Sequence, residues 1–171
     1  MKQAPAIEYN DKKMGFTLIE LMLVIAVISV LAIVSVPKYQ AITDHYKLES
    51  SAQIVVGQLR YAKQLAMDQR KNIYLAMDTH TVEVLGASNK EYGGLQAFDS
   101  GVKFDVSSAA GNGLTVDSQA KGLPHVVYDP RGFIEYPPSG AAVTIVLSTV
   151  RTGRSVMIVD ELQTGDITVE W

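Results

Sequence analysis

The sequence contains no cysteine among its 171 residues. Disulfide bridges, thiolate metal sites and cysteine nucleophiles are therefore excluded. Histidine is also scarce, because there are only three, and none of them has a second histidine at the spacing of a metal-binding pair. The net charge of −3 excludes a globally basic surface of the kind that nucleic-acid-binding domains carry, but it does not exclude a local basic patch.

Motifs of the common enzyme classes are missing as well. The sequence has no nucleophile elbow, no phosphate-binding loop and no dinucleotide fingerprint. Asp160, Glu161 and Asp166 form an acidic stretch whose spacing fits no EF-hand, so a solvated acidic loop is favoured over a calcium site. We therefore predict no catalytic residue, no cofactor and no metal site.

The chain does have one long apolar run, from Phe16 to Val36, in which Glu20 is the only charged residue. As a helix, its 21 residues span about 31 Å, which matches the hydrocarbon core of a bilayer. The run lacks the polar stripe of a buried core helix, so a transmembrane helix is favoured. The lysines at 12–13 predict a cytoplasmic amino terminus, with the bulk of the chain across the membrane.

A secretory signal peptide is the main alternative for this segment. Such a peptide has an apolar run of about 7–15 residues followed by a small-residue cleavage site. Here the run is longer, and the small residue Gly15 precedes it. An ionised Glu20 inside hydrocarbon is costly unless it is paired, or unless it reaches the interface. Cleavage after Gly15 would create an amino group on Phe16, and this group could pair with the Glu20 of a neighbouring copy.

The order of these features resembles the class III signal of type IV prepilins and type II secretion pseudopilins. The matching residues are Lys12-Lys13, Gly15, Phe16, Thr17-Leu18-Ile19-Glu20, the apolar run and Pro37. The resemblance implies cleavage by a prepilin peptidase between Gly15 and Phe16, N-methylation of Phe16 and a role for Glu20 and Pro37 in assembly. The leader, residues 1–15, is longer than the leaders typical of this signal.

The same resemblance implies the partners and the location of the chain. The partners would be the prepilin peptidase, an inner-membrane assembly platform and other pilin or pseudopilin subunits, with membrane lipid around the helix before assembly. The chain would cross the bacterial inner membrane once, with its carboxy-terminal domain outside the cytoplasm, and then enter a pilus or pseudopilus. The sequence does not separate type II secretion from type IV pili.

Helical spacing continues beyond Pro37, where a kink or local melting is expected because proline lacks an N–H group. Apolar residues recur at steps of three and four: Tyr39, Ile42, Tyr46, Ala52, Val55, Leu59, Ala62 and Ala66. The opposite face is polar and carries Lys38, Asp44, Lys47, Ser51, Gln58 and Lys63. We therefore predict one helix over about 16–70, with a transmembrane part (16–36) and an amphipathic stalk (37–70). In a pilin-like subunit, the second half of the apolar stripe would pack on the carboxy-terminal domain and the first half on other subunits.

From residue 72 onward the pattern changes to alternation, which is typical of strands. Eight strands are expected, over 73–77, 81–84, 102–106, 125–128, 133–135, 142–150, 154–159 and 167–171. The glycine-rich stretch that includes Gly93, Gly94 and Gly101 is expected to form surface loops. The predicted fold class is thus α+β and pilin-like, with the long helix packed against an antiparallel β domain (71–171) of two small sheets.

The carboxy-terminal half resembles that of the GspH/FimT minor pseudopilins. The residues concerned are Tyr128-Asp-Pro-Arg-Gly-Phe, a β-branched strand, Arg154 and Gly165-Asp-Ile-Thr-Val. This resemblance favours a minor subunit over a major one.

A FimT-like competence pilin that binds DNA is the first alternative. Arg151 and Arg154 bracket Gly153 at a hairpin turn, and Arg131 lies in another turn that is expected nearby. The Gly-Arg-x-Arg motif of that branch is incomplete here, because Val156 stands where its second arginine would be. A membrane-tethered enzyme and a plain anchored protein, left uncut at Gly15, are the remaining alternatives.

Overall fold

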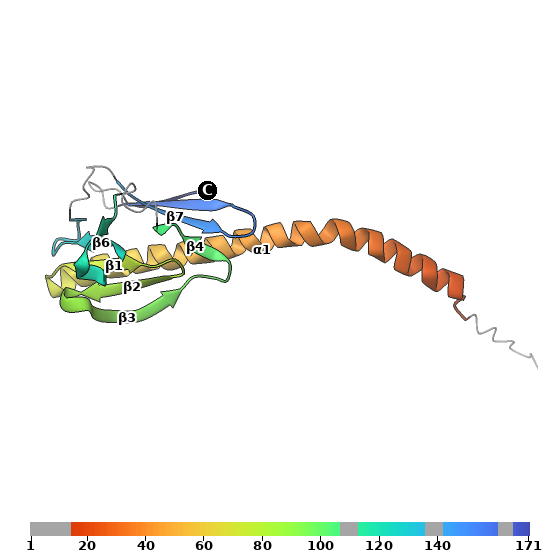
Figure 1. The fold of residues 1–171 in the computed structure, drawn as a ribbon, viewed down its shortest axis with the longest axis horizontal. Helices are drawn as coiled ribbons and strands as arrows, with labels where there is room; N and C mark the ends of the chain where they lie inside the picture. The colour runs from red at the N-terminus through yellow and green to blue at the C-terminus, as the bar shows by residue number, and fades with distance from the viewer. Residues whose placement is uncertain (1–14, 107–112, 136–141, 161–165) are drawn as a thin grey trace, which may run out of the picture. The chain divides into compact units, whose positions relative to one another are not determined.

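The structure is a computed structural model that describes residues 15–106, 113–135, 142–160 and 166–171. A single α-helix of 52 residues, α1 (Leu18–Gln69), precedes strands that form two antiparallel sheets (Figure 1). One sheet has the order β3 (Lys90–Ala97), β2 (Thr81–Gly86), β1 (Ile73–Met77), β6 (Pro124–Tyr128), β5 (Thr115–Val116). The other has the order β4 (Val102–Phe104), β7 (Val143–Thr149), β8 (Ser155–Asp160), β9 (Ile167–Glu170). The described residues also form two short 3₁₀ helices, η1 (Ala87–Asn89) and η3 (Ser118–Ala120). The predicted fold class is confirmed.

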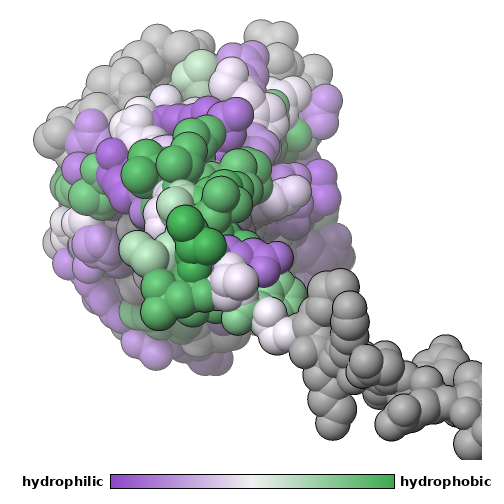
Figure 2. Space-filling view, turned by 90° about the vertical axis from the view of Figure 1, so that its right-hand side faces the viewer, coloured by the Kyte–Doolittle hydropathy of each residue, from purple (hydrophilic) through white to green (hydrophobic). Residues whose placement is uncertain are grey.

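By its internal contacts the chain divides into two units, residues 1–39 and residues 40–171. In the first unit, the large apolar side chains from Phe16 to Val36 are all exposed, with exposed fractions from 44% to 84%. Hydrophobic residues, drawn in green, gather in the middle of the face that Figure 2 turns toward the viewer, with hydrophilic residues, in purple, around them. Length and composition make α1 able to cross a membrane, and none of its most apolar window is buried.

Polar groups within the apolar run are satisfied locally. The hydroxyl of Ser29 donates to the carbonyl of Ile25 at 2.7 Å, and that of Ser35 donates to the carbonyl of Leu31 at 2.8 Å. The helix is continuous at Pro37, so the expected local melting does not occur, whereas a kink there stays a prediction.

The second unit buries one face of α1 against both sheets. The buried positions are Asp44, Leu48, Ser51, Ala52, Val55, Leu59, Ala62 and Ala66, at steps of three and four with one adjacent pair. From Ala52 onward this is the predicted apolar stripe. They share one hydrophobic core with inward-facing residues of the sheets, such as Leu75 of β1 and Ile145 of β7. The carboxy-terminal half of the stalk therefore packs on its own domain, as expected.

The amino-terminal half of the stalk differs from the prediction at two polar residues. Ile42 and Tyr46 are 55% and 64% exposed, as expected for the half that does not pack on its own domain, but Asp44 and Ser51, which were placed on the polar face, are buried. Each buried polar side chain has a partner from the β domain, because Arg151 binds Asp44 and the backbone N–H of Asp99 donates to Ser51 at 3.0 Å. A buried polar group is tolerated when it is hydrogen-bonded, and these partners are distant in sequence. The placement of Asp44 and Ser51 on the polar face was wrong for that reason.

Two parts of the β domain also differ from expectation. The glycine-rich stretch was expected to form loops, but Lys90–Ala97 forms β3, which pairs with β2. Gly93 and Gly94 have φ angles of 79° and 76° inside this strand, and the register with β2 shifts opposite them. Such a bulge needs conformations that glycine adopts readily, and it removes the alternation by which a strand is recognised. Residues 133–135 form only one bridge, between Ile134 and Tyr128.

A buried hydrogen bond joins the two sheets. The hydroxyl of Tyr128, in β6, donates to the carboxylate of Asp160, in β8, and both residues are at most 2% exposed. Burial raises the pKa of Asp160 above its usual value, although the bond from Tyr128 opposes this shift. Burial also raises the pKa of Tyr128, so the phenol remains a donor.

We predict that Asp160→Asn stabilises the domain at neutral pH. The raised pKa of Asp160 means that its contribution to stability is complete below the usual aspartate pKa of about 3.9 and is lost as the pH rises. Asparagine can still accept the bond from Tyr128 but does not titrate. The test is urea unfolding of a 38–171 fragment, which keeps every buried residue that the structure describes. The free energy of unfolding of Asp160→Asn should exceed that of the wild type, by a difference that grows from pH 4 to pH 7.

The control for this prediction is Tyr128→Phe. Because it leaves a buried carboxylate without its donor, it should lower the free energy of unfolding by about 1–3 kcal/mol. An asparagine variant that is less stable than the wild type at pH 7 would contradict the argument.

Candidate functional site

The region around Gly15 lies just before α1 and is open to solvent. A Cβ atom placed on Gly15 would have no atom within 4 Å, and its φ lies outside the left-handed region. Neither space nor backbone conformation therefore requires glycine at this position in the folded chain. Phe16, the next residue, is 84% exposed. This segment is accessible in the way that a peptidase substrate needs.

Thr17 caps the first turn of α1, a role that the sequence analysis did not assign. Its side-chain Oγ1 accepts the backbone N–H of Glu20 at 3.3 Å, and its carbonyl accepts the N–H of Leu21 at 3.2 Å. The order Thr-x-x-Glu at a helix start is that of a capping box, and this spacing was the signal that could have revealed it. The cap places the Glu20 carboxylate in the first turn, where the helix dipole favours a negative charge.

Glu20 is exposed and makes no ion pair with any residue that the structure describes. Its carboxylate is thus placed to meet a cation from another molecule. Pro37, the other residue assigned to assembly, lies inside α1, 17 positions after Glu20.

Arg151 is bound to α1, and its side chain is 51% exposed. Its Nε donates to Asp44 Oδ2 at 3.1 Å, and its Nη2 donates to Asp44 Oδ1 at 2.6 Å and to the carbonyl of Gln40 at 3.0 Å. This is the two-pronged geometry in which arginine binds carboxylates best. Chiefly through these bonds, the guanidinium holds the pKa of Asp44 below its usual value. The pair fixes the β7–β8 turn, residues 150–154, against α1 (Figure 1).

Arg131 does not join the other two arginines. Its Nη2 lies 2.6 Å from Asp129 Oδ2 within its own turn, and the neighbouring Gly132 packs beside Met67 of α1. Met67 is 23 residues beyond Asp44, which corresponds to about 35 Å along a helix. The expectation that Arg131 lies near the β7–β8 turn was therefore wrong. The reason is that Arg131 follows the end of β6, which pairs with the start of β1 just after α1 ends.

One residue of the acidic stretch near the carboxy terminus, Asp160, is not solvated as was expected. Asp160 is buried and bound by Tyr128, whereas Asp166 is exposed and Glu161 lies outside the described residues. Among the described residues, no three histidine or acidic side chains come together as metal ligands would.

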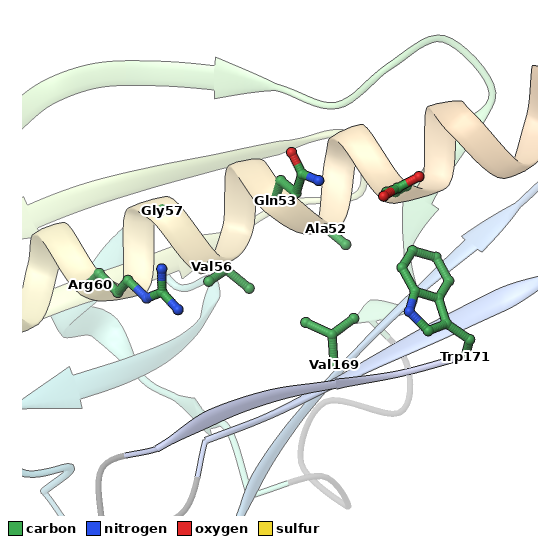
Figure 3. Close-up of a pocket in the computed structure, with 8 residues that line it drawn as sticks. Ala52, Gln53, Val56, Gly57, Arg60, Val169 and Trp171 are labelled. Carbon is green, nitrogen blue, oxygen red and sulfur yellow. The ribbon is translucent and has the colours of Figure 1, made fainter.

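A groove of about 450 Å³ lies between α1 and β9 (Figure 3). Much of its wall is small or apolar, because Ala52 and Val56 of α1 point toward Val169 and Trp171 across it, and Gly57 also lines it. The polar lining residues are Glu49, Gln53 and Arg60. This lining contains no nucleophile beside a base, so it does not have the composition of an active site.

Comparison with known proteins agrees with this reading of the amino-terminal segment. Residues 12–36 match the family model described as the prokaryotic N-terminal methylation motif. No relative is found among curated proteins. The fold is similar to that of the type IV minor pilin FimU of Pseudomonas aeruginosa, with a TM-score of 0.53, 16% identity and coverage of 75% of this chain and 92% of that one. It is also similar to the minor pseudopilin EpsH from the type 2 secretion system of Vibrio cholerae, with a TM-score of 0.51, 10% identity and coverage of 72% and 96%.

Residues 12–36 thus match the methylation motif, and the fold is similar to that of a minor pilin and a minor pseudopilin. The predicted resemblance to prepilins and pseudopilins is confirmed. Both similar structures are of minor subunits, and the likeness of this chain to them is one of fold.

We predict that this pilin-like domain depends on the Arg151–Asp44 pair but not on the neighbouring arginine. Arg151→Gln leaves Asp44 buried without its cation, so the urea midpoint of the 38–171 fragment should fall. The matched change Arg154→Gln is at an exposed position and should alter stability by no more than about 0.5 kcal/mol.

The pH dependence gives a second check on the same pair. Because the pKa of Asp44 is lowered, the stabilisation is present above the usual aspartate pKa of about 3.9 and is lost as the pH falls. The difference between wild type and Arg151→Gln should therefore shrink in acid. Equal effects of the two glutamine variants would contradict the assignment.

Proposed function

We propose that this protein is a minor pilin or pseudopilin subunit that is cut after Gly15, methylated on Phe16 and assembled through its amino-terminal helix. The observation that carries the proposal is the division of α1 into two halves. The half that contains the methylation motif exposes its apolar side chains, and the other half is buried in a pilin-like domain. An apolar surface of this length requires either lipid or other apolar helices.

Processing at Gly15 is supported by the lack of any structural need for glycine there. A glycine in a folded protein usually serves a tight backbone conformation or a close approach, and neither is present at Gly15. Recognition by a peptidase, which reads the chain at this point, accounts for the residue instead.

The pairing of Glu20 with a new amino terminus is supported by position. Cleavage would leave the amino group of Phe16 four residues before Glu20, at the same end of α1. In an assembly of parallel helices, the amine of one subunit would neutralise the Glu20 carboxylate of the next. The charge that is costly in hydrocarbon would then set the axial register of the filament.

DNA capture through arginines, as in a FimT-like pilin, receives less support from the geometry. Arg151 is bound to Asp44 and Arg131 to Asp129, and the two turns lie at different ends of the stalk. Phosphate contacts need arginines that converge on one surface. DNA binding stays an alternative function, and a gel shift with duplex DNA tests it.

The mature amino terminus tests the processing proposal directly. We expect that the chain coexpressed with a prepilin peptidase begins at Phe16 and carries one methyl group on its amine, as read by mass spectrometry of the intact protein. Gly15→Leu should remain uncut while α1 still inserts into the membrane, because the apolar run is unchanged. An unprocessed wild-type chain would instead support a plain membrane anchor.

Assembly tests the role of Glu20. Glu20→Ala should leave membrane insertion intact, because it removes the only charge from the run, but filament assembly should be lost. Glu20→Gln is the informative control, since glutamine can still close the capping box but carries no charge. Filaments can be counted by immunoelectron microscopy, and normal assembly of either variant would sink the pairing argument.

A further inference from the structure

The β7–β8 turn lies close to the point where the apolar run ends. Arg151 donates to the carbonyl of Gln40, which is only four residues after Val36. As helix, four residues rise about 6 Å, and even fully extended they span no more than about 14 Å. This upper limit on the distance from Val36 to Gln40 follows from covalent geometry alone, so it holds for any direction of the apolar helix.

These distances match the layer of lipid headgroups. A bilayer of about 40–45 Å contains a hydrocarbon core of about 30 Å, so the headgroup layer is about 5–8 Å thick on each side. Tyr39 lies in the same interval of sequence and is 73% exposed, and tyrosine is enriched at membrane interfaces. When Phe16–Val36 occupies the hydrocarbon core, the turn is within reach of the headgroups.

The turn presents side chains suited to that layer. Val150 is 64% exposed although it is a large apolar residue, and Arg154 is exposed at the other end of the turn. A tip that combines an apolar side chain with an arginine can enter the interface while the charge contacts phosphate. Gly153, with φ of 67°, allows the tight return of the chain between them.

The turn is also held in a fixed position. The N–H of Val150 donates to the carbonyl of Gly101 at 2.9 Å, and the N–H of Thr149 donates to the carbonyl of Arg154 at 2.8 Å. With the Arg151–Asp44 pair, these bonds tie the tip to β4 and to α1. Contact with the bilayer would therefore cost little ordering of the turn.

The charge at this end of the domain favours an anionic surface. Asp44 is already neutralised by Arg151, and Asp99, near Gly101, is half-buried. Lys47 donates from its Nζ to Ser100 at 3.1 Å, so a second cation lies beside the turn. Because the whole chain has a net charge of −3, anionic lipid would attract this end more than the rest of the domain.

We propose that the β7–β8 turn of the membrane-inserted subunit rests on anionic phospholipid headgroups through Val150 and Arg154. This inference rests on the proposed function, because it needs α1 in a bilayer. The contact holds the domain against the membrane before assembly, and extraction into a filament breaks it.

Fluorescence of single-cysteine variants tests the contact, since the natural chain has no cysteine to remove. Val150→Cys, labelled with a polarity-sensitive dye, is placed as full-length protein in nanodiscs of phosphatidylcholine with or without phosphatidylglycerol. We expect a blue-shifted emission and severalfold stronger quenching by spin-labelled lipid in the anionic discs. Leu95→Cys, at a position in β3 that is 58% exposed, is the matched control and should respond to neither.

Changes at Arg154 test the electrostatic part. Arg154→Glu should abolish the response of the label at position 150, Arg154→Lys should keep most of it, and raised salt should weaken it. A label at position 150 that behaves like the label at position 95 would overturn the proposal.

Two further outcomes separate the competing explanations. A label on Val30→Cys reports whether the apolar helix is inserted. If that label is exposed to water, both the proposed function and this inference are overturned. If it is buried in lipid while the label at position 150 is in water, only this inference is overturned. In a gel shift with duplex DNA, binding that is lost in Arg154→Ala, together with an aqueous label at position 150, would assign the turn to nucleic acid and overturn the lipid contact.

Discussion

The apolar half of α1 has no partner in its own chain, and the remaining features of the molecule follow from this constraint. Fifteen large apolar side chains from Phe16 to Val36 are exposed. Burying each of them is worth about 1.5–3 kcal/mol, so together they favour lipid or other apolar helices by tens of kcal/mol. A single Glu20 costs several kcal/mol in hydrocarbon, which is far too little to prevent insertion. It is enough, however, to favour an environment in which the carboxylate is paired.

The other half of the same helix is tied to its domain by a different kind of interaction. Its core face is apolar from Ala52 to Ala66, but nearer the membrane the contacts become polar, with Asp44 bound by Arg151 and Ser51 bound by the backbone of Asp99. An ion pair is weaker than an apolar core as a source of stability but stricter in geometry. The domain is therefore held to α1 in one register at the end that follows the apolar run in sequence.

The sequence was sufficient for the features that have a local cause. The apolar run, the processing motif and most strands follow from composition and period, and the buried stripe from Ala52 follows from helical spacing. Apart from β3, the errors concern residues whose environment is created by distant parts of the chain. Asp44 is buried because Arg151, 107 positions later, satisfies it, and β3 escaped prediction because its glycine bulge erases the alternation. Arg131 was misplaced because the sheet topology, and not the turn type, decides which turns meet.

The β7–β8 turn takes part in both kinds of interaction. Arg151 satisfies Asp44 and donates to the carbonyl of Gln40, so it is committed to the fold, while Arg154 and Val150 of the same turn remain exposed. Two arginines three residues apart thus have different tasks, one internal and one directed outward. The exposed Val150 does not stabilise the isolated domain, because its apolar side chain remains in water. A bilayer that begins within about four residues of Gln40 gives it an apolar neighbour, and the rigid turn holds it where that neighbour is.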